Sequence, residues 1–354
     1  MKKNLLSLLL AITTVVLQAQ NTNYGVNSGT GGTENSFFGY YSGNAATTTS
    51  NQNSFFGAYS GQSITAGTQN NAFGYKAMYS NSTGSFNSAF GIHALYSNNA
   101  GWYNTATGNW ALYSTTSGTS NTATGNATLY ANTTGTNNTA VGVHALASNT
   151  TASGNSAFGY QALYSNATGI VNVAVGYQSL YTNTASYNTA MGYQTLYLNS
   201  TGYENDAFGY QALYSNTSGQ QNTAIGYRAL YSNTSSVNNT AIGWRALYSN
   251  STGQLNTATG HNALALNTTG HYNTATGDQA LYQNTTGQFN VANGYHALYD
   301  PDAGSYNTGV GYNSGPSSIN VNNTTALGSN AKTTASNQIR VGNSSVTSIG
   351  GQVG

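Results

Sequence analysis

The chain has 354 residues, of which only 4% are charged, with a net charge of +1 and no cysteine. So few cations leave no electrostatic surface for phosphate groups, and we therefore expect neither nucleic acid nor an anionic membrane as a partner. The lack of cysteine excludes disulfides and thiolate chemistry. The apolar residues, 38% of the chain, are spaced periodically, which indicates a folded protein rather than a disordered one.

The first residues have the pattern of a secretory signal. Lys2 and Lys3 precede an apolar run from Leu5 to Leu17, and small and polar residues follow up to Gln20. The run is too short to span a bilayer comfortably. We therefore expect a signal peptide over residues 1–19, no membrane span, and a mature chain that is secreted or held at the cell surface.

A glycine then returns every 17 residues for most of the chain, with single-residue exceptions. The phrase is clearest at residues 222–233, N-T-A-I-G-Y-R-A-L-Y-S-N, followed by a turn rich in Thr and Ser. A period this short indicates stacked units that are each too small to bury a core alone. The sequence predicts an all-β fold, a parallel β-solenoid or β-roll of about seventeen coils.

Within each coil, the residue before the glycine is usually bulky and apolar, as at Phe158 and Ile225. Small residues flank it, which predicts a very short strand whose bulky residue points into the core. The alanine one step earlier hardly varies, as at Ala224, so its position has room for a methyl group only. Leucine recurs in the second half of the coil, as at Leu163 and Leu230, and is expected to form a second inward column.

The second half of the coil carries Ala-Leu-Tyr, as at residues 162–164, and its period fits either a strand or a short helical turn. We favour the strand because Tyr-Ser-Asn-Thr-Thr is poor helix material. The Asn-Thr-Thr-Gly segments that follow are typical of turns. Asn-x-Ser/Thr sequons fall in these turns, where we expect turn hydrogen bonding, with glycan attachment as the alternative. These sequons are Asn132, Asn149, Asn216, Asn267 and Asn284.

Changes in the phrase divide the chain into four parts. Residues 1–19 are the expected signal peptide, and residues 20–73 contain altered repeats with Phe-Phe-Gly, typical of capping coils. Residues 74–328 form the regular 17-residue solenoid. Residues 329–354 form an irregular C-terminal segment.

The Asn-Thr-Ala-x-Gly phrase, as at residues 222–226 and 239–243, resembles the head repeats of YadA-like trimeric autotransporter adhesins. Those heads are left-handed parallel β-rolls of three chains that bind host or matrix surfaces, so the resemblance implies a homotrimer and an adhesive role. The repeat here is 17 residues rather than the 14 usual in that family. The chain also shows no heptad stalk and no C-terminal barrel, so the family's anchoring does not carry over. Residues 335–351 are similar to the stretch that precedes the intramolecular chaperone of tail-spike proteins, which again implies a trimer.

Catalytic and metal-binding patterns are sparse. Glu204 and Asp206 are the only acidic pair inside a regular coil, and a solvated turn explains them better than an acid/base pair. His93, His144 and His296 share one position in coils that are not adjacent, so they cannot converge on a metal ion. We expect no enzyme activity and no cofactor.

One tyrosine column is the strongest candidate for an association face, because twelve rings recur at one repeat position. Its partner is expected to be a copy of the chain, or else a glycan or an extracellular surface. The column includes Tyr164, Tyr181, Tyr197, Tyr214, Tyr231 and Tyr248.

The expected function is therefore that of a secreted structural or adhesive surface protein. The alternative is a tail-spike-like protein that binds or cleaves polysaccharide. A minor alternative is an ice-binding solenoid, because Thr-x-Thr pairs occur in two patches of two coils each. These pairs begin at Thr105, Thr122, Thr257 and Thr274.

Overall fold

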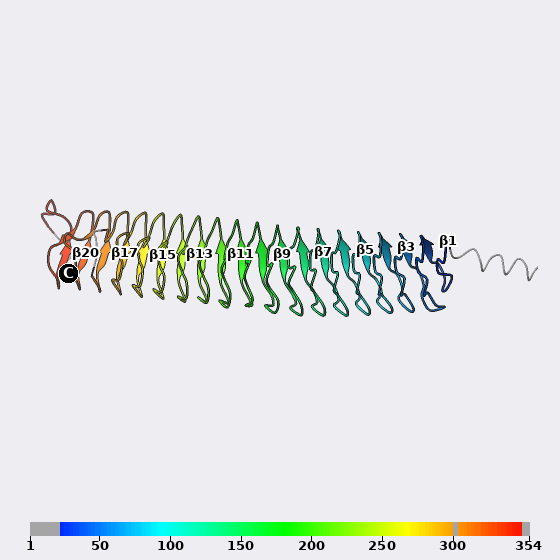
Figure 1. Cartoon of the computed structure of the whole chain (residues 1–354). Helices are drawn as coiled ribbons and strands as arrows, with labels where there is room; N and C mark the ends of the chain where they lie inside the picture. Colours follow the sequence, from blue (N-terminus) through cyan, green and yellow to red (C-terminus); the bar gives the residue numbers. More distant parts are fainter. Residues whose placement is uncertain (1–21, 300–303, 349–354) are drawn as a thin grey trace, which may run out of the picture. The chain divides into compact units, whose positions relative to one another are not determined.

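The computed structural model describes residues 22–299 and 304–348 (Figure 1). The expected signal peptide, residues 1–19, and the acidic residues Asp300 and Asp302 lie outside the described residues. The fold is a parallel β-solenoid, and nothing in its described part is helical, so no helix there is long and apolar enough to cross a membrane. The chain divides into two compact units, one ending at Ile170 and the other beginning at Val171.

The first unit contributes nine short strands, each paired in parallel with the next along the chain. Equivalent repeat positions lie side by side, so that Ala72 faces Ala89 across β4 and β5. The strands are β1 (Thr22–Tyr24), β2 (Ser36–Phe38), β3 (Ser54–Phe56), β4 (Asn71–Phe73), β5 (Ser88–Phe90), β6 (Thr105–Thr107), β7 (Thr122–Thr124), β8 (Thr139–Val141) and β9 (Ser156–Phe158).

The second unit repeats this arrangement with eleven such strands, and a pair of two-residue strands, β19 and β21, lies beside the last coils. Its described strands are β10 (Val173–Val175), β11 (Thr189–Met191), β12 (Asp206–Phe208), β13 (Thr223–Ile225), β14 (Thr240–Ile242), β15 (Thr257–Thr259), β16 (Thr274–Thr276), β17 (Val291–Asn293), β18 (Thr308–Val310), β19 (Gly315–Pro316), β20 (Thr325–Leu327), β21 (Lys332–Thr333) and β22 (Ile339–Val341). The coils exceed the expected seventeen because β1, β2 and β22 belong to altered repeats that still pair in register.

The core contradicts one prediction and confirms another. Phe158 and Ile225 are each 40% exposed, so the expectation that this column points inward is wrong. In a strand of three residues only the middle side chain points into the coil, and that residue is the alanine, fully buried at Ala224. Leu163 and Leu230 are also fully buried, which confirms the leucine column.

The first coils fill the same interior in another way. Phe55 occupies the middle of β3 and is fully buried, where later coils have alanine. Gly61 stands where later coils have leucine, and a Cβ at Gly61 would come within 2.3 Å of the Phe55 ring. A large and a small residue have thus exchanged places, which conserves the packed volume of the coil.

The second half of each coil is a chain of turns, so the favoured strand at residues 162–164 is wrong, and so is the helical alternative. Leu230 has φ of 52°, a left-handed conformation that costs a leucine roughly 1–2 kcal/mol. Ala229 and Leu230 are nevertheless both fully buried, and the Leu230 amide donates to the Ala246 carbonyl of the next coil at 3.0 Å. Burial and inter-coil hydrogen bonding offset the conformational cost.

The periodic glycine permits the close approach of neighbouring coils. Gly226 has φ of 135°, and a Cβ there would lie 2.4 Å from the Gly243 carbonyl oxygen. No L-residue fits this combination of conformation and space. The 17-residue glycine period is therefore the spacing at which one coil passes over the next.

Buried asparagines form ladders along the stack. Asn216, one of the sequon residues, donates its side-chain amide to Oδ1 of Asn199 at 2.7 Å and to the Gly219 carbonyl at 3.0 Å. Such bonds satisfy turn carbonyls that would otherwise be buried without partners. The prediction of turn chemistry is confirmed, because all five sequon asparagines are fully buried, namely Asn132, Asn149, Asn216, Asn267 and Asn284.

Candidate functional site: the outward aromatic ladders

The tyrosine column identified in the sequence is a ladder of stacked rings. In the second unit, consecutive ring centroids lie 5.1 to 5.3 Å apart and consecutive ring planes are nearly parallel. The side chains are half-buried because each ring packs its face against the next. The ladder therefore presents mainly ring edges and hydroxyl groups to solvent. Its members are Tyr181, Tyr197, Tyr214, Tyr231 and Tyr248.

This environment changes the acidity of Tyr214, in the middle of the ladder. Burial raises the pKa of the Tyr214 hydroxyl, and the neighbouring rings of Tyr231 and Tyr197 raise it further, because two adjacent phenolates would repel. The neutral phenol is the favoured form. Tyr164, the remaining member of the expected face, lies in the first unit, where its ring contacts His144 edge to face at 6.2 Å.

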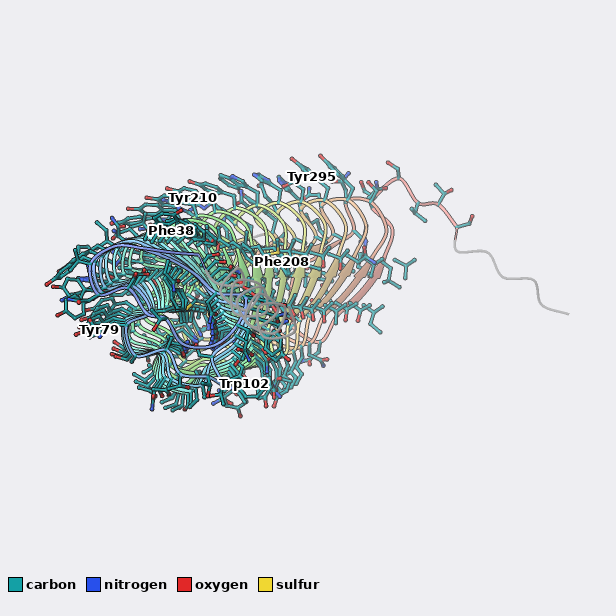
Figure 2. All side chains as sticks on the ribbon, turned by 90° about the vertical axis from the view of Figure 1, so that its right-hand side faces the viewer. Phe38, Tyr79, Trp102, Phe208, Tyr210 and Tyr295 are labelled. Atoms are coloured by element: carbon teal, nitrogen blue, oxygen red, sulfur yellow. The ribbon has the colours of Figure 1, made fainter. Side chains whose placement is uncertain are left out.

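A second ladder, which the sequence reasoning missed, follows the periodic glycines of the second unit. Its rings are 37% to 43% exposed, and consecutive centroids lie 5.1 to 5.7 Å apart. Figure 2 shows Tyr210 of this ladder on the same edge as Tyr295. Tabulating the residue after each glycine would have found it. The ladder consists of Tyr177, Tyr193, Tyr210, Tyr227 and Trp244.

A polar column runs between the two tyrosine ladders. Gln211 donates to Gln194 at 3.2 Å, and Arg228 Nε donates to Gln211 Oε1 at 3.0 Å. The Arg228 guanidinium carbon lies 5.2 Å from the ring centroids of both Tyr227 and Tyr231, so it contacts one ring of each ladder. These contacts tie the two ladders into one surface.

The chain of side-chain hydrogen bonds in the polar column stops at the next coil, at Arg245. Arg245 stacks over Tyr248 with its guanidinium carbon 4.1 Å from the ring centroid. Its Nε is buried without a hydrogen-bond partner, because Arg228 in the preceding coil offers only donors. The Arg245 backbone amide donates to the Tyr227 carbonyl, so the two coils are adjacent. The like charges of Arg228 and Arg245 therefore lie on neighbouring coils.

The strand residues that were expected inside form an outward apolar column. Met191 pairs with Phe208, Phe208 with Ile225, and Ile225 with Ile242 across the parallel strands β11 to β14. Met191, Ile225 and Ile242 are 41%, 40% and 38% exposed. This strand column is separated from the second ladder by only the glycine, so the two make a continuous outward surface.

The candidate acidic and histidine residues that the structure describes make separate, local contacts. Glu204 and Asp206 are both exposed, and Glu204 accepts a hydrogen bond from Gln221 at 2.9 Å. Across residues 22–299 and 304–348, no three His, Asp or Glu side chains gather closely enough to hold a metal ion.

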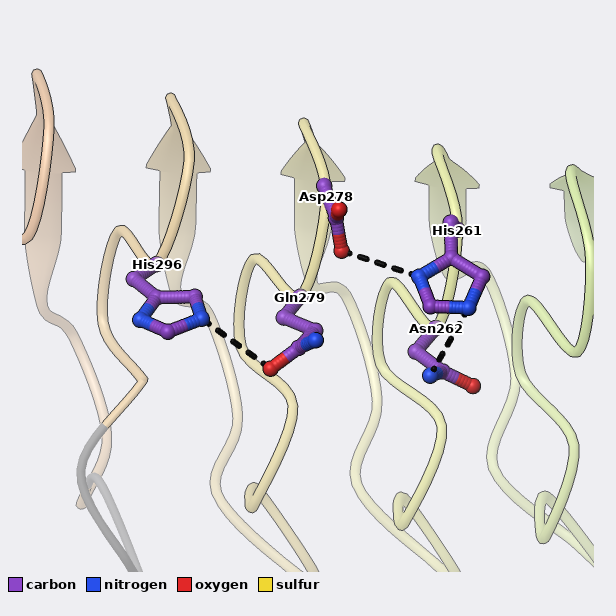
Figure 3. A network of polar contacts seen from close by, with 5 residues as sticks. All are labelled: His261, Asn262, Asp278, Gln279 and His296. Carbon is purple, nitrogen blue, oxygen red and sulfur yellow. Dashed lines mark hydrogen bonds and ion pairs between the residues drawn. The ribbon is translucent and has the colours of Figure 1, made fainter.

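Two histidines of the second unit each contact one polar side chain in a neighbouring coil. His261 Nδ1 lies 3.0 Å from Asp278 Oδ1, and His296 Nε2 lies 3.0 Å from Gln279 Oε1 (Figure 3). Each pair links neighbouring coils, which is the same arrangement as the glutamine contacts. These histidines extend the surface columns of the solenoid.

No protein-family model matches the chain, and no curated protein matches it. The resemblance to YadA-like adhesin heads therefore stays a prediction from the repeat phrase, supported by the parallel β-solenoid and by nothing more specific.

Proposed function

We propose that this chain is a secreted structural or adhesive surface protein that associates with copies of itself, and that it is not an enzyme. The observation that carries the proposal is the outward strand column of Met191, Phe208, Ile225 and Ile242 beside an exposed aromatic ladder. A contiguous exposed apolar surface of several side chains is typical of an interface. A repeated column also pairs readily with the same column on another copy.

The finer parts of the proposal come from the sequence. Secretion follows from the signal pattern of residues 1–19, and a homotrimer follows from the resemblance to adhesin heads and tail-spike segments. The exposed positions of Glu204 and Asp206, with Glu204 bonded to Gln221, support a non-catalytic role over the polysaccharide-cleaving alternative.

Sedimentation of the mature protein tests the proposal, and the expected result is a mass above that of one chain. Replacing Phe208, Ile225 and Ile242 together by threonine should reduce that mass. The coil carrying Thr259 has threonine at the same position, so the fold should be retained. A wild-type protein that sediments as a single chain and does not adhere to surfaces would contradict the proposal.

The tyrosine column is tested separately by replacing Tyr197, Tyr214 and Tyr231 with serine. We propose that this column, from Tyr164 to Tyr248, contributes its ring edges and hydroxyls to association. Reduced mass in this variant assigns the interface to the tyrosine ladder. Unchanged mass, with a reduced mass in the threonine variant, assigns the interface to the strand column.

A further inference from the structure

The tyrosine ladder of the first unit has one missing ring. Tyr79, Tyr96, Tyr113 and Tyr130 stack with centroid separations of 5.1, 5.0 and 5.1 Å. The next coil has Ala147 at this position, and the column resumes at Tyr164. A cavity of about 290 Å³ opens at the gap, lined by Tyr130, Tyr164, His144, Ser148, Ala127, Ala131 and Ala147.

The gap has the dimensions of a single ring. Tyr130 and Tyr164 are two coils apart, which places them about 10 Å from one another along the stack. A ring inserted midway would therefore lie about 5 Å from each, within the range of stacked pairs and equal to the spacing that the ladder already uses. Alanine at positions 127 and 131 keeps neighbouring large side chains out of this space.

We infer that this gap is a binding slot for one neutral pyranose ring of a glycan. Aromatic faces carry the negative part of the ring quadrupole, and the C–H groups on both faces of a pyranose are slightly positive, so two tyrosine faces suit a sugar. The hydroxyl of Ser148 and the imidazole of His144 line the slot and offer donors and acceptors to sugar hydroxyls. No Asp, Glu, Lys or Arg lines it, which favours an uncharged sugar.

The other candidate occupant is an aromatic side chain from a second copy of the chain. An aromatic ring would stack equally well but would leave Ser148 and His144 without new partners. A sugar ring can stack on Tyr130 and Tyr164 and can also form hydrogen bonds with Ser148 and His144. The inference rests on the proposed adhesive role and names its ligand class, but occupancy of the slot is measurable independently of self-association.

The first experiment titrates the wild-type protein with methyl β-glucopyranoside and follows ring resonances by NMR. The expected result is saturable shifts of the Tyr130 and Tyr164 rings, with unchanged sedimentation. Sorbitol, which has similar hydroxyl groups but no ring, should cause none. Shifts confined to other residues, equal shifts with sorbitol, or binding of p-cresol without binding of the glucoside would overturn the inference.

The second experiment fills the slot. Ala147→Tyr restores the ring that neighbouring coils possess, so it should raise the midpoint of thermal unfolding while weakening glucoside binding by about tenfold or more. Ala147→Ser keeps the slot open and should bind like the wild type. Retained binding in a folded Ala147→Tyr protein would overturn the inference. Loss of self-association in this variant, without any glucoside binding by the wild type, would assign the slot to a second copy instead.

Discussion

The backbone amide and the side-chain amide of Asn222 both donate to Oδ1 of Asn205, each at 3.1 Å. Asn222 repeats the relationship with the next coil, because its own Oδ1 accepts from the backbone and side chain of Asn239. All three residues are buried. The chain has few charges and no disulfide, so this internal polar ladder is a principal link between successive coils.

Asn222→Ala should therefore destabilise the protein. The change removes the acceptor of the buried Asn239 backbone amide and the donor to the Ser236 carbonyl, and one such unpaired group alone costs about 1–3 kcal/mol. Asn205 Oδ1 keeps the backbone amide of residue 222 as a donor. Chemical denaturation measures the free energy of unfolding. The neighbouring Gln221→Ala is the control, because Gln221 is exposed and its removal should cost no more than about 0.5 kcal/mol. Equal losses in the two variants would contradict the ladder's role.

Substitution on the inward face of strand β13 should destabilise the protein more than substitution on its outward face. Ala224→Leu inserts volume into a filled interior and should cost about 1–3 kcal/mol or more. Ile225→Thr alters only an outward position and cross-strand contacts worth roughly 0.2–1 kcal/mol. Thermal unfolding of both variants checks the prediction, and a larger loss for Ile225→Thr would restore the inward assignment that the structure overturns.

Arg228→Gln should stabilise the second unit by about 1 kcal/mol. Glutamine at this position continues the contacts of Gln194 and Gln211, provides an acceptor for the unpartnered Arg245 Nε, and removes one of two adjacent like charges. These gains oppose the loss of the cation–π contacts of Arg228. Lys76→Gln is the matched control, since it also removes a cation that lies over tyrosine rings. A lower unfolding temperature for Arg228→Gln than for the wild type would refute this argument.

Alkaline pH should weaken the tyrosine ladder. The pKa of Tyr214 is raised in the folded protein by burial and by Tyr231 and Tyr197, so the neutral phenol favours folding. Its contribution is fully present below the ordinary tyrosine pKa of about 10 and is lost as the pH rises through the higher folded pKa. Denaturation measured between neutral pH and the alkaline range should show this decline. Tyr214→Phe, which cannot ionise, should show a smaller one.

Acid should perturb the first unit at His93. Burial lowers the pKa of His93, and the nearby Lys76 lowers it further, so the neutral imidazole is favoured in the folded state. Its Nδ1 accepts a hydrogen bond from the Trp110 indole at 3.1 Å, which protonation abolishes. The contribution is complete above about pH 6.5 and is lost as the pH falls through the lower folded pKa. Trp110 fluorescence should follow this titration, and it should stay constant over the same range in His93→Gln.

Much of this architecture was readable from the repeat. The spacing of glycine predicted stacked coils, because a glycine such as Gly226 is needed wherever one coil passes close over the next. The recurrent alanine at positions such as Ala224 indicated room for a methyl group only in the regular coils, and Leu230 indicated the core. The asparagine turns were predicted correctly because part of their hydrogen bonding is local, as from Asn216 to the Gly219 carbonyl. The bonds to the neighbouring coil, as from Asn216 to Asn199, were not predicted.

The sequence by itself therefore determined the coil, its period and its turns, since these depend on which residues fit a repeated backbone. Only the tertiary structure decided which side of each strand faces inward, because a three-residue strand is too short for alternation to distinguish Ala224 from Ile225. The tertiary structure also decided which parts of the tyrosine rings are accessible to a partner. Their ring faces pack against one another in adjacent coils, and alanine interrupts this stack at Ala147 in the first unit, where the cavity opens, and at Ala265 in the second.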